Sequence, residues 1–229
     1  MTRPVRNKGL KSGDSKGSRK DAALKHLKRV DPRFYKATSA HHASLPGELP
    51  ERRTRKELFE SLVSIVIAQQ LGIAAANTIT SNVKKACGRR VTSESVFKTR
   101  EAELRRAGIS AAKVKTLKSI AKAVGDNSLD LLVLKRLPES EASQQLLQIW
   151  GLGPWSVDMF MMNSLGREDV FSISDLGLVR AIEMIYDLPK NTPRTSLLAI
   201  SKKWSPHRSY ASLLLWRTRS AIIKDTKAD

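Results

Sequence analysis

The sequence predicts an all-α protein with two helical lobes. Segments with apolar residues at helical spacing follow one another along the chain, and almost no stretch alternates in the manner of a strand. Residues that start and stop helices separate these segments, and the loops between them are short and polar. We therefore expect roughly eight to ten helices, no internal repeat and no N-terminal β domain.

The first half of the chain carries four helix signals, each with a capping residue. Thr54 and Glu57 have the spacing of a capping box, in which each side chain binds the backbone N–H of the other residue. Gly88 supplies the left-handed conformation that ends many helices. The expected helices are 22–30 after Asp21, 56–70 after Thr54, 73–87 before Gly88, and 111–125 after Ser110.

Four further helices are expected in the second half. Pro154 suits a first helical position, where its missing N–H costs nothing, and Gly166 is the expected end of that helix. The expected helices are 139–149 after Pro138, 154–166 from Pro154, 176–186 after Asp175, and 207–223 after Pro206. The irregular stretch 39–53 is expected to link the two lobes.

Composition indicates a globular protein that binds a polyanion. The 229 residues include 41 Lys and Arg against 22 Asp and Glu, a formal charge of +19. A single cysteine, Cys87, excludes an intrachain disulfide. No apolar run is long enough to span a membrane, and no signal-peptide core is found, so we expect an intracellular protein in a nucleoid or a nucleus. Residues 1–19 are basic and expected to form a disordered arm.

The most patterned segment of this basic chain contains no lysine. Residues 140–189 hold two arginines, seven carboxylates and no lysine. Within them, Gly151 and Gly153 flank one apolar residue, with a helix expected on each side. The second helix would present free backbone N–H groups to a phosphate, so a strand could be held without lysines. Such a turn is also a common helix–helix connector.

The same turn begins a resemblance to a known family. Four stretches resemble, in order and spacing, blocks of the helix-hairpin-helix (HhH-GPD) DNA glycosylase superfamily, in its 3-methyladenine glycosylase branch: SLVSIVIAQQLGIAAANTI, LLQIWGLGPWSVDMF, LGREDVFSISDLGLVRAI and KKWSPHRSYASLLLWR. They span about residues 56–220. The resemblance implies a two-lobed fold with a DNA cleft between lobe one, about 54–136, and lobe two, about 20–50 with 137–229 and the hairpin 147–158.

Asp175 matches the catalytic aspartate of that family. A glycosylase must stabilise the positive charge that grows on the sugar as the base leaves, and a fixed carboxylate does so. The alternative role is a helix N-cap, and the two are compatible. In the bifunctional branch a lysine lies two residues after the second hairpin glycine, where this chain has Trp155. The resemblance therefore implies a monofunctional glycosylase without lyase activity.

Aromatic residues are expected to receive the extruded base. A base alkylated at a ring nitrogen is cationic, and π-faces attract cations. Trp155 and Trp216 match aromatic positions of the family's base pocket, and Met159 lies one helical turn beyond Trp155 on the same face. Asn163, where some relatives have an aromatic, completes the expected pocket, and core packing is the alternative for the two tryptophans and Met159. Trp150, Trp204 and Phe160 are expected to be structural.

DNA contacts are expected from three places. Gln70 matches the residue that fills the gap left by the flipped base, with Leu71 as second choice, although an exposed helix-ending loop is the alternative. Arg208 has two alternatives, phosphate binding and a buried ion pair. The complete set of DNA-binding candidates is Gln70, Leu71, Gly72, Gly151, Gly153, Pro154, Ser156, Arg208 and Ser209.

Several departures leave the substrate range open. Ser172 and Ser174 replace a proline and an acidic residue common in relatives, Gly72 replaces a serine or histidine, and Asn163 an aromatic. The chemistry requires no cofactor, while a sodium or potassium ion is expected at the hairpin carbonyls of Leu147, Ile149 and Leu152. The expected partner is double-stranded DNA with damaged bases, bound by a monomer. A non-catalytic DNA-binding protein of the same fold is the alternative.

Overall fold

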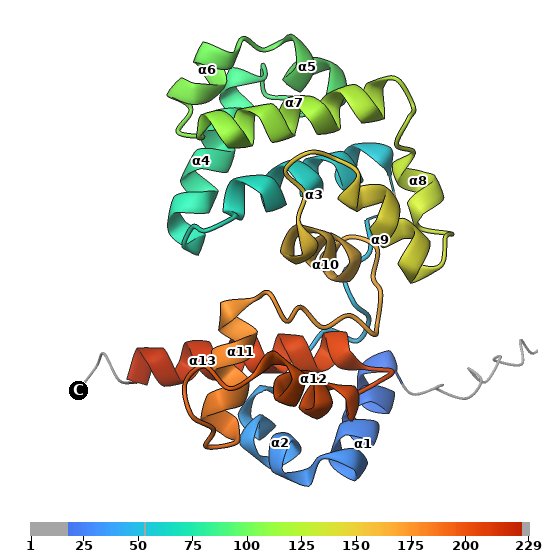
Figure 1. Cartoon of the computed structure of the whole chain (residues 1–229), viewed down its shortest axis with the longest axis vertical. Coiled ribbons are helices and arrows are strands. Elements are labelled where there is room, and N and C mark those ends of the chain that lie inside the picture. Colours follow the sequence, from blue (N-terminus) through green and yellow to red (C-terminus); the bar gives the residue numbers. More distant parts are fainter. Residues whose placement is uncertain (1–17, 53, 226–229) are drawn as a thin grey trace, which may run out of the picture.

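The computed structural model describes residues 18–52 and 54–225, and these fold into helices joined by loops (Figure 1). They contain thirteen α-helices, one 3-10 helix and no strand, which confirms the all-α prediction. The number exceeds the expected eight to ten because it includes four short helices of four to six residues, at 32–37, 93–98, 101–106 and 131–134, that were not expected. No helix of the described residues has both the length and the apolar character needed to cross a bilayer.

The helices, in chain order, are α1 Arg19–Val30, α2 Pro32–Ala37, η1 Ser39–His41, α3 Arg55–Ala68, α4 Ile73–Ala86, α5 Ser93–Lys98, α6 Glu101–Arg106, α7 Ala111–Gly125, α8 Leu131–Leu134, α9 Glu139–Leu147, α10 Pro154–Asn163, α11 Leu176–Ile185, α12 Arg194–Lys202 and α13 Arg208–Asp225. Several expected caps are present, including the Thr54–Glu57 capping box and the Ser110 cap of α7. Others differ: Ser18 caps α1 with Asp21 as its partner, and α10 ends at Asn163, three residues before Gly166.

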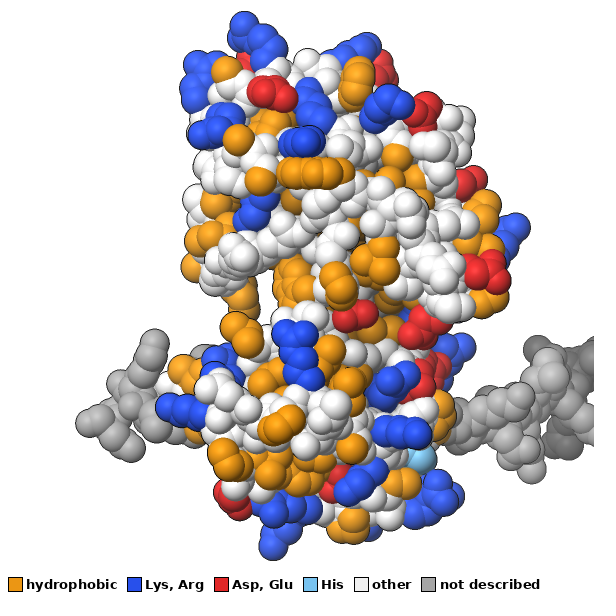
Figure 2. All heavy atoms as spheres, in the orientation of Figure 1, with side chains coloured by type: hydrophobic (Ala, Val, Ile, Leu, Met, Phe, Trp, Pro, Cys, Tyr) orange, Lys and Arg blue, Asp and Glu red, His pale blue; other side chains and the backbone are white. Residues whose placement is uncertain are grey.

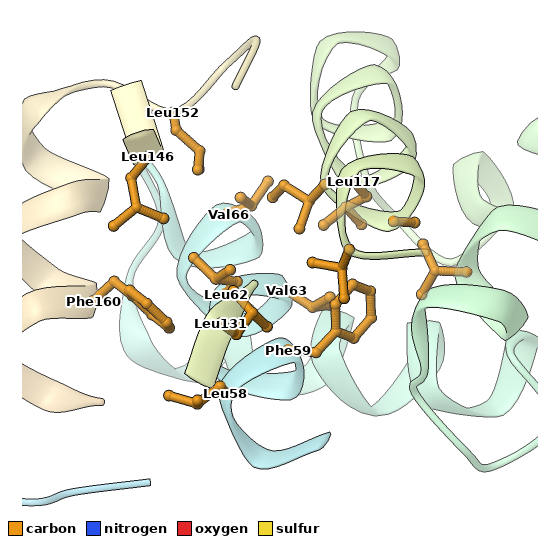
Figure 3. Close-up of a cluster of buried hydrophobic side chains, with 14 of the residues drawn as sticks. Leu58, Phe59, Leu62, Val63, Val66, Leu117, Leu131, Leu146, Leu152 and Phe160 are labelled. Atoms are coloured by element: carbon orange, nitrogen blue, oxygen red, sulfur yellow. The ribbon is translucent and has the colours of Figure 1, made fainter. Parts of the chain in front are cut away.

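The first lobe comprises α3 to α10 and is built around α3. After its exposed first turn, this helix buries six apolar side chains in the core of the lobe, namely Leu58, Phe59, Leu62, Val63, Val66 and Ile67. Figure 3 shows Leu62 and Val66 between Leu117 of α7 on one side and Leu146 of α9 and Phe160 of α10 on the other. Phe160 is fully buried, as expected.

The second lobe comprises α1, α2 and α11 to α13, packed around Trp204. This side chain is fully buried and donates its indole N–H to Asp31 Oδ2 at 3.0 Å. Asp31 also caps α2 through Phe34 N and accepts the Tyr186 hydroxyl. One buried carboxylate thus joins three elements of the lobe, and Trp204 is structural, as the sequence suggested.

The predicted lobe boundaries were wrong for residues 137–170. Helices α9 and α10, together with the hairpin between them, pack into the core of the first lobe and not the second. Side chains from Phe171 onward join the second core, together with those of 23–49. Two connections therefore cross between the lobes, and they run side by side where Arg52 N donates to Ser164 O at 2.7 Å.

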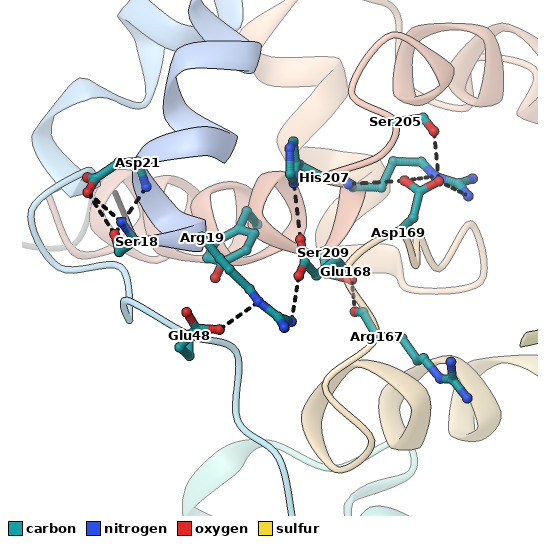
Figure 4. A network of polar contacts seen from close by, with 12 residues as sticks. Ser18, Arg19, Asp21, Glu48, Arg167, Glu168, Asp169, Ser205, His207 and Ser209 are labelled. Carbon is teal, nitrogen blue, oxygen red and sulfur yellow. Dashed lines mark hydrogen bonds and ion pairs between the residues drawn. The ribbon is translucent and has the colours of Figure 1, made fainter. Parts of the chain in front are cut away.

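The expected inner end of the N-terminal arm, residues 18 and 19, is wrong. Residues 1–17 lie outside the described part of the chain, whereas Ser18 and Arg19 begin α1. Arg19 forms ion pairs with Glu48 at 2.9 Å and Glu168 at 2.7 Å (Figure 4). These contacts anchor the start of α1 beside both connections between the lobes.

Candidate active site

A cavity of about 710 Å³ lies between the two lobes. Figure 2 shows the hollow between the upper and lower halves of the molecule. Four segments line the cavity, namely the α3–α4 turn and the first turns of α7, α10 and α11. A volume of this size accommodates a small organic group.

Asp175 lies on the wall of this cavity and is held from both lobes. Trp155 of the first lobe donates its indole N–H to Oδ2 at 2.9 Å, and Trp216 of the second lobe donates to Oδ1 at 3.2 Å. Oδ1 also accepts Leu178 N at 2.9 Å, which makes Asp175 the N-cap of α11. The cap and the cavity-facing position therefore coexist, and three N–H donors fix a group that has only acceptors when ionised.

Gly177 is a site residue that the sequence reasoning missed. A Cβ at this position would lie 2.8 Å from Asp175 Oδ1 and 3.4 Å from Trp216 Cδ1. The carboxylate and the indole occupy the space that any larger residue would need. The motif DLG contained the signal, because a glycine in the first turn after a capping aspartate leaves room beside the carboxylate.

The hairpin before α10 packs closely on α7. Gly151 has a φ of +84°, and a Cβ there would lie 1.9 Å from Thr116 Oγ1. Gly153 is the N-cap of α10 and Pro154 occupies its first turn, as predicted. Helix geometry leaves the backbone N–H groups of Gly153, Trp155 and Ser156 without an intrahelical acceptor, so an anion could bind there.

The α3–α4 turn contributes the opposite wall of the cavity. Gln70 and Leu71 both line it; Gln70 is exposed with a φ of +57°, and the Leu71 side chain is 39% exposed. Gly72 is the N-cap of α4, and a Cβ on it would meet open space. The predicted gap-filling residues therefore project where a DNA strand could reach them.

Gln69 and Lys113 also line the cavity, and neither was predicted. Gln69 donates its amide to Ser156 Oγ at 2.8 Å and to Gly151 O at 3.2 Å. Lys113 donates to Ile67 O and to Gln69 O, each at 2.7 Å. The hairpin segment lacks lysine, but α7 brings one to the same cavity, and burial lowers its pKa.

Met159 and Asn163 were wrongly assigned to the base pocket. Met159 is only 6% exposed and belongs to the core of the first lobe, because α10 turns this side toward its neighbours. Asn163 donates its amide to Met159 O at 3.1 Å. Neither residue lines the cavity, whereas Trp155 does. Trp216 is not among the lining residues either, but its indole N–H binds Asp175 at the cavity wall.

Ser209 and Arg208 are structural, contrary to the DNA-binding assignment. Ser209 is fully buried; its hydroxyl donates to Arg167 O at 2.6 Å and accepts Val170 N at 3.0 Å. Arg208 forms a two-bond ion pair with Asp169, at 2.7 and 3.0 Å, so the ion-pair alternative holds. Burial alone would raise the pKa of Asp169, but bonds from Arg208 and Ser205 outweigh it and lower the pKa.

Two other predicted positions differ in environment. The Ser156 hydroxyl is buried and accepts from Gln69, so only its backbone N–H remains for a phosphate. Trp150, expected to be structural, is 46% exposed on the hairpin, and Lys115 Nζ lies 4.2 Å from its ring centroid.

Asp158 of α10 has a shifted pKa. Burial and the nearby Glu139 charge raise the pKa of this carboxyl to about 6.

Comparison with known proteins agrees with this geometry. Residues 63–206 match the HhH-GPD superfamily of base excision DNA repair proteins. DNA-3-methyladenine glycosylase 1 of Schizosaccharomyces pombe is 34% identical over 167 residues, covering 72% of this chain and 73% of the relative. The crystal structure of a Bacillus halodurans DNA-3-methyladenine glycosidase superposes with a TM-score of 0.74 at 29% identity, covering 90% of this chain and 93% of the other. A structure of the S. pombe 3-methyladenine DNA glycosylase with abasic DNA has a TM-score of 0.74 at 30% identity, covering 86% and 95%.

Proposed function

The chain belongs to the HhH-GPD superfamily of base excision DNA repair proteins, and we propose that it is a monofunctional glycosylase that excises alkylated purines from DNA. It hydrolyses the N-glycosyl bond and leaves an abasic site. The observation that carries the proposal is Asp175, held by one tryptophan from each lobe at the wall of an interlobe cavity. The expected substrates are purines of the 3-methyladenine and 7-methylguanine type in double-stranded DNA.

The proposed reaction begins with extrusion of the damaged nucleotide into the cavity. As the C1′–N bond breaks, its electron pair leaves with the base and positive charge grows on the sugar. Asp175 stabilises this charge, and a water oxygen then bonds to C1′ while its proton passes to the Asp175 carboxylate. Because three N–H groups already orient the carboxylate, little reorganisation is needed during the reaction.

The hairpin is proposed to hold the DNA strand through backbone groups. The first turn of α10 offers N–H groups to a phosphate, and Gln70 or Leu71 enters the gap left by the base. Carbonyls of Leu147, Ile149 and Leu152 remain our proposed ligands for a sodium or potassium ion. We propose that the protein acts as a monomer and is located inside the cell with DNA.

Base release from methylated DNA tests this function. Purified protein is incubated with a duplex whose purines carry a labelled methyl group, and free bases are separated from DNA. We expect free methyladenine or methylguanine and abasic sites that break only on alkali treatment. Binding of lesion DNA with no base release over hours would favour the non-catalytic alternative, and direct strand nicking would contradict the absence of lyase activity.

A further inference from the structure

The α3–α4 turn holds a strained conformation at the mouth of the cavity. Gln70 has a φ of +57°, in the left-handed region that non-glycine residues rarely adopt, and its side chain is exposed. Contacts of the Gln70 side chain with the protein core cannot fix this conformation, because the residue points to solvent. Strain of this kind persists only where surrounding groups hold it.

Lys113 holds the turn from the side of α7. Its ammonium donates to Ile67 O and Gln69 O, each at 2.7 Å. These carbonyls lie at the C-terminal end of α3, where a helix leaves its carbonyls without intrahelical donors and where a cation is favoured. The two bonds fix the direction in which the chain leaves α3, immediately before Gln70.

Gln69 ties the same turn to the hairpin. Its amide donates to Gly151 O at 3.2 Å and to Ser156 Oγ at 2.8 Å. Ser156 belongs to the first turn of α10, whose N–H groups are proposed to bind phosphate, and Trp155 beside it donates to Asp175. Hydrogen bonds thus join α7 to the turn and the turn to the hairpin, and Trp155 of the hairpin in turn binds the aspartate.

We propose that Lys113 and Gln69 are positioning residues that preorganise the α3–α4 turn for insertion into DNA and couple this insertion to the hairpin's grip on the strand. The proposal rests on the function proposed above. It predicts that both residues act on extrusion of the base, which is costly for a paired nucleotide and inexpensive for an unpaired one. Neither residue needs to touch the reacting atoms.

Lys113→Met and Gln69→Met are the test variants, since each keeps an unbranched side chain of similar length and removes the donors. Single-turnover base release is measured on a methylated purine opposite its normal partner and on the same purine in an unpaired bulge. We expect the paired substrate to react at least about tenfold more slowly and the unpaired one within about twofold of wild type. Lys113→Arg, which keeps the donors, should restore most of the paired rate.

Lys118→Met is the matched control. Lys118 lies on the same helix and also donates to two backbone carbonyls, those of Phe97 and Thr99, but it does not line the cavity. It should lose comparable stability and keep the wild-type ratio of paired to unpaired rates. The proposal would be overturned if the Lys113 and Gln69 variants kept the wild-type ratio of paired to unpaired rates, either because both substrates react equally more slowly or because neither does.

A second readout separates this proposal from the glycosylase assignment. A 2-aminopurine placed beside a stable abasic-site analogue reports insertion of the turn by fluorescence and requires no chemistry. We expect the fluorescence change of wild type to be lost in Lys113→Met and kept in Lys118→Met. If the wild-type protein produces the fluorescence change but releases no base from methylated DNA, the glycosylase function alone is refuted. If Lys113→Met produces the same fluorescence change as wild type, the positioning role alone is refuted.

Discussion

Replacing Gly177 with alanine should impair the reaction while leaving the fold intact. The added Cβ would lie 2.8 Å from Asp175 Oδ1, closer than carbon and oxygen atoms approach without a bond, so the carboxylate must move. Oδ1 accepts two of the three bonds that fix it, from Leu178 N at 2.9 Å and Trp216 Nε1 at 3.2 Å. The substitution therefore acts on the orientation of Asp175 and on the adjacent Trp216 indole, whose Cδ1 would lie 3.4 Å from the added Cβ.

The expected magnitude follows from those bonds. A hydrogen bond to a charged group contributes about 1.5–3 kcal/mol, so losing one of them in the transition state slows base release by roughly 10- to 150-fold. Alanine is favoured over glycine in a helix by up to about 1 kcal/mol, which offsets part of the strain. We therefore expect the free energy of unfolding to change by less than about 1 kcal/mol.

Single-turnover base release and urea unfolding measure the two effects separately. Gly125→Ala is the control, because Gly125 is also helical and a Cβ there meets no atom within 4 Å. It should gain a little stability and release base at the wild-type rate. A Gly177→Ala enzyme with wild-type activity would refute the idea that Oδ1 and its donors determine the orientation of Asp175.

Three further outcomes are expected. The pKa of Asp158 is about 6 in the fold against 3.8 for a free side chain. The contribution of this carboxyl to the free energy of unfolding is therefore fully present below pH 3.8, where it is protonated, and is lost as the pH rises through 6. Asp158→Asn should therefore raise the free energy of unfolding by roughly 1–2 kcal/mol at pH 8, allowing for solvent screening, and leave it unchanged at pH 3.5 in urea titrations. Gly151→Ala should destabilise the protein by at least about 2 kcal/mol through its positive φ and its clash with Thr116, and a second change, Thr116→Ala, should recover part of this loss in thermal unfolding. In DNA-binding titrations, Lys115→Ala should reduce the magnitude of the slope of log affinity against log salt by about 0.9, and Trp150→Ala should reduce it by less. A slope for Lys115→Ala equal to that of wild type would exclude a phosphate contact by Lys115.

The sequence predicted those features that depend on local rules. The capping box at Thr54, the proline in the first turn of α10 and the N-cap at Asp175 each follow from side-chain chemistry within one turn of helix. The order of the four family-like blocks added the fold and located Asp175 in the cleft. Such predictions hold in the folded protein because the hydrogen-bonding groups involved lie close together along the chain.

Features that depend on distant packing were missed or wrong. Helical spacing placed Met159 on the same face as Trp155, but it could not show that the face turns from cavity to core within one turn. The role of Lys113 depends on α7 lying against the end of α3, and nothing near it in sequence indicates that contact. Likewise, Arg208 finds its partner Asp169 far back along the chain, so both alternatives stayed open until the fold resolved them.

The central claim is that Asp175 stabilises the sugar while the base departs, and its replacement by asparagine tests this most directly. Asn keeps the shape and one acceptor oxygen but removes the negative charge. Base release from methylated duplex DNA is measured under single-turnover conditions, alongside binding to DNA that contains a stable abasic-site analogue. We predict that Asp175→Asn releases base at least about a hundredfold more slowly and binds the abasic duplex within a few-fold of wild type. An Asp175→Asn enzyme that releases base at the wild-type rate would contradict the assignment.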